Sequence, residues 1–294
     1  MPYELAGRAD KGGNRFEIRW VIYQMLKVLD EKLDYVVLEP LGDDERGVDI
    51  WIGQKDDSRE GQQCKGRNGS KEYWDYGTAN AKGIFTKWKY QLDRGISNKV
   101  ALVSPLVFTF LEDLIERAKN TSNNPKDFYN NQILNASKEF VDFFNNFCKV
   151  MEINPEKDLD LIKCISYLNR IAYYQFPDTE LKELILSKIS YLLIGNEQEI
   201  YEAFIAWIVD GDILGKIINQ SVLYTFLKEK NIRFKNLGTD ERIMPRLEEL
   251  NQEYKTSFIP LSNGLINRGE FSIFRDAINS GDSLIINLRQ VLWI

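Results

Sequence analysis

The stretch that decides the fold is residues 47–65, GVDIWIGQKDDSREGQQCK. It holds two short runs, VDIWI at 48–52 and GQQCK at 61–65, on either side of a polar turn. Two runs of this length joined by a polar turn predict a β-hairpin. The rest of the predicted sheet is built outward from this hairpin.

Polar side chains gather on the predicted hairpin. Because side chains alternate along a strand, Gln63 and Lys65 share one face and Cys64 points to the other. Asp49 interrupts the apolar first run, and pairing of the two runs brings it beside Gln63 and Lys65. The alternatives are a turn-forming role for Asp49 at the end of its strand and a solvated edge strand for Gln63 and Lys65.

The flanking segments supply the remaining elements of the first 123 residues. Apolar periodicity predicts the order helix, strand, strand, strand, helix, strand. The elements are a helix over 14–29, strands over 35–39, 48–52 and 61–65, a helix over 79–94, a strand over 99–103, and a further helix capped by Ser104. This order predicts an α/β core with a mixed sheet.

The first helix adds a carboxylate to the hairpin. Glu17 and Gln24 lie on the same helical stripe as Trp20, Val21 and Val28, which are core-type residues. A carboxylate facing a core is costly unless something pairs with it, and a metal ion or Lys65 would supply that partner. The alternative is a buried hydrogen bond between Glu17 and Gln24.

Glu39 ends the predicted strand 35–39. The sequence leaves open whether it is a second metal ligand or a surface residue.

Beyond the polar run 121–124, strand signals fade and amphipathic helical stretches dominate. The sequence therefore predicts three parts: the α/β domain at 1–123, an all-α connector or oligomerisation region at 124–257, and a last segment at 258–294.

Composition narrows the chemistry that is available. The 294 residues include no histidine, which excludes Ser-His-Asp catalysis and histidine-ligated zinc. The three cysteines have no paired spacing, and no signal peptide or membrane-spanning run is evident, so a cytoplasmic location is expected.

Charge is divided unevenly along the chain. The net charge is −6, but residues 30–60 hold eleven acidic side chains against four basic ones. Residues 65–94 hold seven basic side chains against three acidic ones. This division suits a site that holds a cation beside a polyanion, and the alternative is a solvated surface.

These residues predict metal-assisted phosphodiester chemistry. Asp49, the Gln63 amide and the Cys64 carbonyl offer oxygen ligands for Mg²⁺, with Mn²⁺ as a substitute. The metal would polarise a phosphate, and the Lys65 ammonium would orient water or neutralise developing charge.

The pattern GVDIWI…QQCK with an upstream helical glutamate resembles the PD-(D/E)xK nuclease superfamily, most of all the Mrr-like restriction endonucleases and the effector domains of antiviral STAND NTPases. The resemblance implies a restriction-endonuclease-like αβββαβ core. It also implies catalytic roles for Asp49, Gln63, Lys65 and Glu17, with Glu17, Asp49, Gln63 and Cys64 at the metal.

A second resemblance concerns the tail. Residues 258–287 resemble the lead-in to the ATPase module of STAND NTPases, but the phosphate-binding loop of that module does not follow. This resemblance leaves three alternatives: the N-terminal portion of a larger protein whose C-terminal NTPase or sensor portion is absent from this chain, a natural truncation, or a standalone relative.

The resulting expectation is a Mg²⁺-dependent endonuclease for double-stranded DNA, acting as a homo-oligomeric effector of a bacterial antiphage system. The chemistry does not separate DNA from RNA. The alternative function is a catalytically inactive nuclease-like scaffold or a partner-binding module. Candidate nucleic-acid contacts, for which solubility or a small satellite core is the competing explanation, are Arg67, Lys71, Trp74, Lys82 and Lys89.

Overall fold

The computed structural model describes residues 4–66, 69, 71–121 and 124–235, the side chains of residues 4–14 excepted. The described residues as far as Phe234 belong to one compact unit. The end of the predicted region 124–257, from residue 236 onward, and the segment 258–294 lie outside the described residues.

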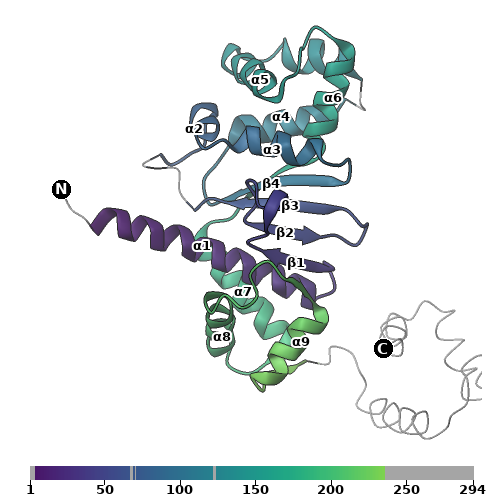
Figure 1. Cartoon of the computed structure of the whole chain (residues 1–294). Coiled ribbons are helices and arrows are strands. Elements are labelled where there is room, and N and C mark those ends of the chain that lie inside the picture. Colours follow the sequence, from purple (N-terminus) through teal and green to yellow (C-terminus); the bar gives the residue numbers. More distant parts are fainter. Residues whose placement is uncertain (1–3, 67–68, 70, 122–123, 236–294) are drawn as a thin grey trace, which may run out of the picture. The chain divides into compact units, whose positions relative to one another are not determined.

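Six strands of the described residues form one mixed sheet in the order β5-β4-β3-β2-β1-β7 (Figure 1). Strands β1, β2 and β3 are antiparallel neighbours, β3, β4 and β5 run parallel, and β7 pairs antiparallel with β1. The strands are β1 (Tyr35–Leu38), β2 (Ile50–Gly53), β3 (Arg59–Cys64), β4 (Asn98–Ser104), β5 (Ile171–Gln175) and β7 (Ile217–Asn219).

The hairpin prediction is confirmed. Ile50 pairs with Gln62 and Gly53 pairs with Arg59 across β2 and β3. The α/β class and the mixed sheet are confirmed as well. The elements of this part that flank the strands are α1 (Glu4–Leu29), the short helical turn η1 (Gly42–Asp44), α2 (Tyr76–Ala81), α3 (Ile84–Asp93) and α4 (Thr109–Lys119).

Three helices differ from the prediction. The single helix expected over 79–94 forms as α2 and α3, with Lys82 and Gly83 between them. The first helix, expected over 14–29, begins at Glu4, so the pair Gly12-Gly13 lies inside α1. Ser104 does not cap a helix, because its hydroxyl accepts hydrogen bonds from the Trp74 indole at 2.9 Å and from the Leu106 N–H at 3.3 Å. Helix α4 begins at Thr109 instead, after Phe108.

The prediction of an all-α region after residue 124 is wrong. Strands β5 and β7 come from this region and form the two edges of the main sheet. Two short strands also pair with each other, β6 (Leu193–Ile194) and β8 (Arg233–Phe234). The helical elements are η2 (Asp127–Ile133), α5 (Lys138–Met151), α6 (Asp158–Leu168), α7 (Asp178–Leu192), α8 (Glu197–Val209) and α9 (Gln220–Glu229).

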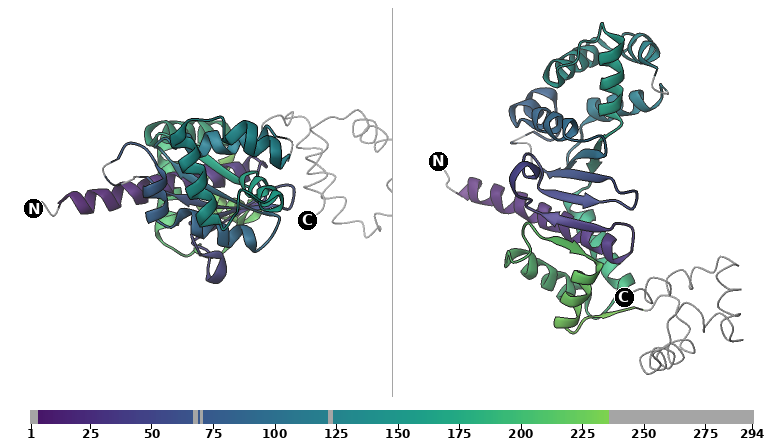
Figure 2. Two further views of the ribbon diagram at one scale, coloured as in Figure 1. Left: turned by 90° about the horizontal axis from the view of Figure 1, so that it is seen from above. Right: turned by 45° about the vertical axis from the view of Figure 1, so that its right-hand side comes forward.

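The core has two halves, one on each face of the sheet. On one face, α1, α7, α8 and α9 bury apolar side chains against β1 and β2. On the other, α2 to α6 pack on β4 and β5, where alternation turns Val100 and Leu102 toward them and Val103 away. Figure 2 shows the strands lying between the two helical groups. Among the described residues, no helix has the length and apolar content needed to cross a bilayer.

Candidate functional site

Strand direction brings several polar residues to one edge of the sheet. Because β1 and β3 both run opposite to β2, the ends of β1 and β3 meet the start of β2. The Glu39 N–H donates to the Asp49 carbonyl at 3.0 Å, and the Lys65 N–H donates to the Val103 carbonyl at 2.8 Å. The residues just outside the strands, Glu39, Asp49 and Lys65, therefore lie at the same edge.

Asp49 and Lys65 contact each other there. One carboxylate oxygen of Asp49, Oδ2, accepts a hydrogen bond from the Cys64 backbone N–H at 2.7 Å. The same oxygen lies 3.3 Å from the Lys65 ammonium nitrogen. The side chains of Asp49 and Lys65 are 21% and 30% exposed, so both charges remain accessible to a ligand.

Helix α1 brings Glu17 to this edge. The pKa of Glu17 is raised to about 7, first by burial and then by the nearby charges of Asp49 and Glu39, against the opposing effect of Lys65. A hydrogen bond to Glu39 also favours the protonated form of Glu17. Gln24 is not its partner, because neither polar atom of the buried Gln24 amide has a hydrogen bond with the described residues.

Glu39, which the sequence left as either a metal ligand or a surface residue, lies near Glu17 and Asp49 with an exposed side chain. Its φ of 42° lies in the left-handed region, which is unusual for a residue other than glycine and is often found at functional sites. Burial and the charge of Asp49 raise its pKa, while the hydrogen bond from Glu17 opposes the increase. We call Glu17, Glu39 and Asp49 the carboxylate cluster.

Gln63 lies one residue beyond the pairing of Ile50 with Gln62, and so opposite Asp49. Its side chain is only 2% exposed, and its amide oxygen accepts no hydrogen bond from the described residues. A buried amide oxygen without a donor costs about 1–3 kcal/mol, so this atom is suited to a ligand that supplies positive charge or a donor.

Cys64 contributes backbone atoms to this edge. Its side chain packs in the core formed with α1. Burial raises the pKa of its thiol well above the ordinary value. The neutral thiol is therefore a poor metal ligand, and metal binding by the Cys64 carbonyl oxygen stays a prediction.

The donors around this edge are oxygen atoms, which suit Mg²⁺ or Mn²⁺. Within the described part of the chain, no three acidic or thiol groups form a ready-made metal site. Glu17 and Glu39 are hydrogen-bonded to each other, and Asp49 is paired with Lys65. A cation bound there would displace the proton that Glu17 and Glu39 share.

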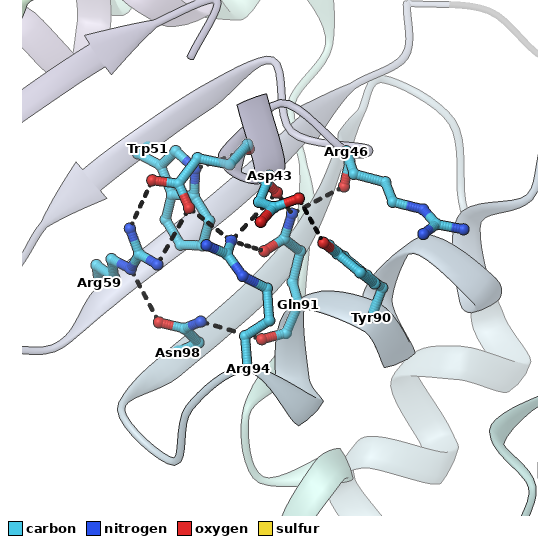
Figure 3. Close-up of polar contacts among 9 residues, drawn as sticks. Asp43, Arg46, Trp51, Arg59, Tyr90, Gln91, Arg94 and Asn98 are labelled. Carbon is cyan, nitrogen blue, oxygen red and sulfur yellow. Dashed lines mark hydrogen bonds and ion pairs between the residues drawn. The ribbon is translucent and has the colours of Figure 1, made fainter. Parts of the chain in front are cut away.

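The connection between Glu39 and Asp49 is fixed to α3 by a second set of polar contacts, shown in Figure 3. Arg59 donates two hydrogen bonds to the Asp44 carboxylate at 2.9 and 3.2 Å, and Arg94 donates one at 2.5 Å. These bonds outweigh burial and lower the pKa of Asp44. The Gln91 amide donates at 3.0 Å to both the Asp43 and the Arg46 carbonyls.

The predicted nucleic-acid contacts have different surroundings. Trp74 is buried, which leaves no ring face for a base to stack on. Lys71 is paired with Asp75, and Lys89 is paired with both Asp93 and Glu152. Lys82 is exposed, lies 5.9 Å from the centre of the Trp74 ring, and has no ion pair with the described residues. Arg67 lies outside the described residues.

No family model matches the chain, and no curated protein matches it in sequence. Among solved structures it is similar to the Acinetobacter baumannii Cap4 SAVED/CARF-domain containing receptor with the cyclic trinucleotide 2'3'3'-cAAA, at 15% identity and a TM-score of 0.45. That match covers 74% of this chain and 46% of the receptor.

Two further matches are of the same kind. The Acinetobacter baumannii receptor with 3'3'3'-cAAA matches at 14% identity and a TM-score of 0.44, over 76% of this chain and 46% of that one. The Moraxella osloensis Cap4 SAVED/CARF-domain containing receptor matches at 13% identity and a TM-score of 0.43, over 74% and 48%. The chain spans about half the length of the receptors that it matches.

These matches correct two expectations from the sequence. The matching structures are described as SAVED/CARF-domain containing receptors, two of them with a cyclic trinucleotide, and not as PD-(D/E)xK nucleases, which contradicts the nuclease resemblance. The expected endonuclease function on double-stranded DNA is contradicted with it, and the alternative of a partner-binding module agrees better with these findings. A restriction-endonuclease core is not confirmed beyond the α/β class.

Proposed function

We propose that this chain is a binding module that holds a divalent cation at the carboxylate cluster and, through that cation and Lys65, one phosphate group of a ligand. The observation that carries the proposal is the meeting of Glu17 on α1, Glu39 directly after β1 and Asp49 directly before β2 at one edge of the sheet. Like charges brought together in this way are unfavourable unless a proton or a cation lies among them.

Each residue has a role in this proposal. The carboxylates of Asp49 and Glu39 would hold the cation, and Glu17 would join them after losing its proton. The Gln63 amide oxygen would be a further ligand of the cation. The cation would supply positive charge to a phosphate oxygen. Lys65 already lies 3.3 Å from Asp49 and adds a second positive group beside it.

A phosphate is the ligand group that this arrangement favours. A cation held by carboxylates binds hard anionic oxygens, and a lysine ammonium is a common point-charge partner for phosphate. The receptors that match in structure bind cyclic trinucleotides, whose phosphodiester groups present such oxygens. We therefore choose 3'3'3'-cAAA as the probe.

The experiment measures cation binding first. Calorimetric titration of the full chain with Mn²⁺ is expected to show one site, and Asp49→Asn is expected to lose it. Asp56→Asn is the matched control, because Asp56 lies in the β2–β3 turn and bonds Ser58 and Lys99. Absence of Mn²⁺ binding by the unmodified chain would refute the proposal.

The second measurement adds 3'3'3'-cAAA with and without Mn²⁺. Binding is expected only when Mn²⁺ is present, and Lys65→Ala is expected to weaken it without removing the cation. Equal binding in a chelator would show that the cation plays no part. Cleavage of the probe in Mn²⁺, abolished by Lys65→Ala, would replace the proposed binding role by catalysis.

A further inference from the structure

Three basic side chains come from the segment before Asp49 and from the α2–α3 region: Arg46, Lys87 and Lys82. None of the three forms an ion pair with the described residues, and Arg46 and Lys82 are exposed. We call them the basic strip. None of them takes part in the proposed cation site, and two of them were not singled out by the sequence.

The Lys87 side chain sets the direction of the strip. A Cβ atom added to Gly47 would lie 2.5 Å from the Lys87 Cβ and 2.7 Å from its Cδ. A Cβ added to Gly83 would lie 3.8 Å from the Lys87 Cε. The side chain therefore extends from Gly47 toward Gly83, so it joins the neighbourhood of Arg46 to that of Lys82.

The other two cations of the basic strip, Arg46 and Lys82, each lie over an aromatic ring. The Arg46 guanidinium lies 4.4 Å from the centre of the Tyr90 ring, and Figure 3 shows it extending away from the Asp43 side chain. At the other end, Lys82 lies over the ring of the buried Trp74. Aromatic contacts hold a cation in place without neutralising it, unlike a carboxylate.

The neighbouring cations are arranged differently. Arg59 and Arg94 both bond Asp44, and Lys89 bonds Asp93 and Glu152. Their charges are compensated within the protein. The charge of the basic strip is left for an external anion, and Arg46 lies only three residues before Asp49 in the chain.

We propose that the basic strip binds successive phosphodiester groups of an oligonucleotide ligand, one of whose phosphates is held at the carboxylate cluster. This rests on the proposed function and names its ligand class. A row of cations is suited to a backbone with regularly spaced negative charges, and aromatic rings beneath the cations limit their motion. Because cyclic and linear oligonucleotides share phosphodiester groups, the test includes both.

The experiment measures binding of fluorescein-labelled 3'3'3'-cAAA and of a labelled single-stranded 12-mer by anisotropy in Mn²⁺. The triple variant Arg46→Gln, Lys82→Gln, Lys87→Gln is compared with Lys99→Gln. Lys99 is the matched control because it lies near the start of β4, at the opposite end of the sheet, and pairs with Asp56. Thermal unfolding and Mn²⁺ titration verify that each variant keeps the fold and the cation site.

For whichever ligand the unmodified chain binds, the triple variant is expected to bind roughly tenfold or more weakly. The salt dependence of its binding to the linear ligand is expected to fall by about 0.7 in logarithmic slope for each phosphate that the variant no longer neutralises. Lys99→Gln is expected to match the unmodified chain. Retained affinity and slope in the triple variant, with intact Mn²⁺ binding, would overturn the strip and leave the proposed function standing.

Two other outcomes are also decisive. If the unmodified chain binds Mn²⁺ but neither oligonucleotide, the strip has no phosphodiester ligand and the inference is wrong. If the unmodified chain does not bind Mn²⁺, it is the proposed function that fails.

Discussion

The carboxyl groups of Glu17 and Glu39 are hydrogen-bonded to each other, although one lies on the long first helix and the other directly after a strand. Two carboxyl groups form such a bond only while one of them keeps its proton. The pair is therefore stable without a cation at low pH and increasingly repulsive as the pH rises.

The hydrogen-bonded pair of Glu17 and Glu39 makes the free energy of unfolding depend on pH. The pKa of Glu17 is about 7 in the folded chain against an ordinary 4.5, so the folded state holds a proton that the unfolded state has lost between these values. The contribution of this bound proton to the free energy of unfolding is fully present below pH 4.5, and it is lost as the pH rises toward about 7.

Glu17→Gln removes this titration. We expect the variant to be more stable than the unmodified chain by about 1–3 kcal/mol at about pH 8, and equally stable at about pH 4. Urea unfolding in a chelator at both values measures this. An identical pH response of the two proteins would show that Glu17 has an ordinary pKa.

Asp44 is predicted to position the carboxylate cluster. Asp44→Asn keeps the size of the side chain but removes the charge that Arg59 and Arg94 share, which loosens the connection between Glu39 and Asp49. We expect Mn²⁺ affinity to fall about tenfold, equivalent to about 1.4 kcal/mol. Calorimetric titration measures the affinity, with Asp56→Asn as control. A lower melting temperature with unchanged affinity would indicate a structural role alone.

Gly47→Ala is predicted to destabilise the chain and to displace Lys87. The position has a φ of 74°, and the added methyl group would meet the Lys87 side chain at 2.5 Å. We expect a loss of about 1–3 kcal/mol in the free energy of unfolding, measured in urea. Gly42→Ala is the control, because its φ is 68° but no atom lies within 4 Å of the added carbon. Equal losses in the two variants would mean that Lys87 moves aside freely.

Trp20→Phe is predicted to lower the free energy of unfolding by more than the loss of side-chain volume alone explains. The Trp20 indole N–H donates to the buried Gln62 amide oxygen at 2.6 Å, and that oxygen loses this donor in the variant. We expect an excess loss of about 1–3 kcal/mol relative to Trp88→Phe. Trp88 is the matched control because its buried indole N–H has no acceptor among the described residues. Similar urea midpoints for both variants would contradict this.

The sequence predicted the centre of the fold well because that part follows simple rules. The apolar run of β2 is followed by a polar turn that leads into β3, and the buried face of α3 repeats with helical period through Ile84, Phe85 and Trp88. Strand β5 was missed because its IAYYQ run directly follows a helix. Strand β7 has only three residues, and its pairing with β1 decides its conformation.

The candidate site was also predicted only where local sequence pattern decides the position of a residue. Asp49 and Lys65 could be placed together from strand alternation and the hairpin. Glu39 could not, because its position depends on the direction of β1 relative to β2 and on a left-handed backbone conformation. The charge excess of residues 65–94 pointed to a basic surface, but sequence does not show which lysines are already paired with acids.

The positions of β5 and β7 have a consequence for how the chain is made. Both outer strands of the sheet are encoded late, so β4 and β1 keep bare edges until residues 171–175 and 217–219 have left the ribosome. Unpaired strand edges invite association with other chains during synthesis. A product that stops near residue 123 would carry the acidic residues but expose two open edges, and is expected to aggregate where the longer chain folds.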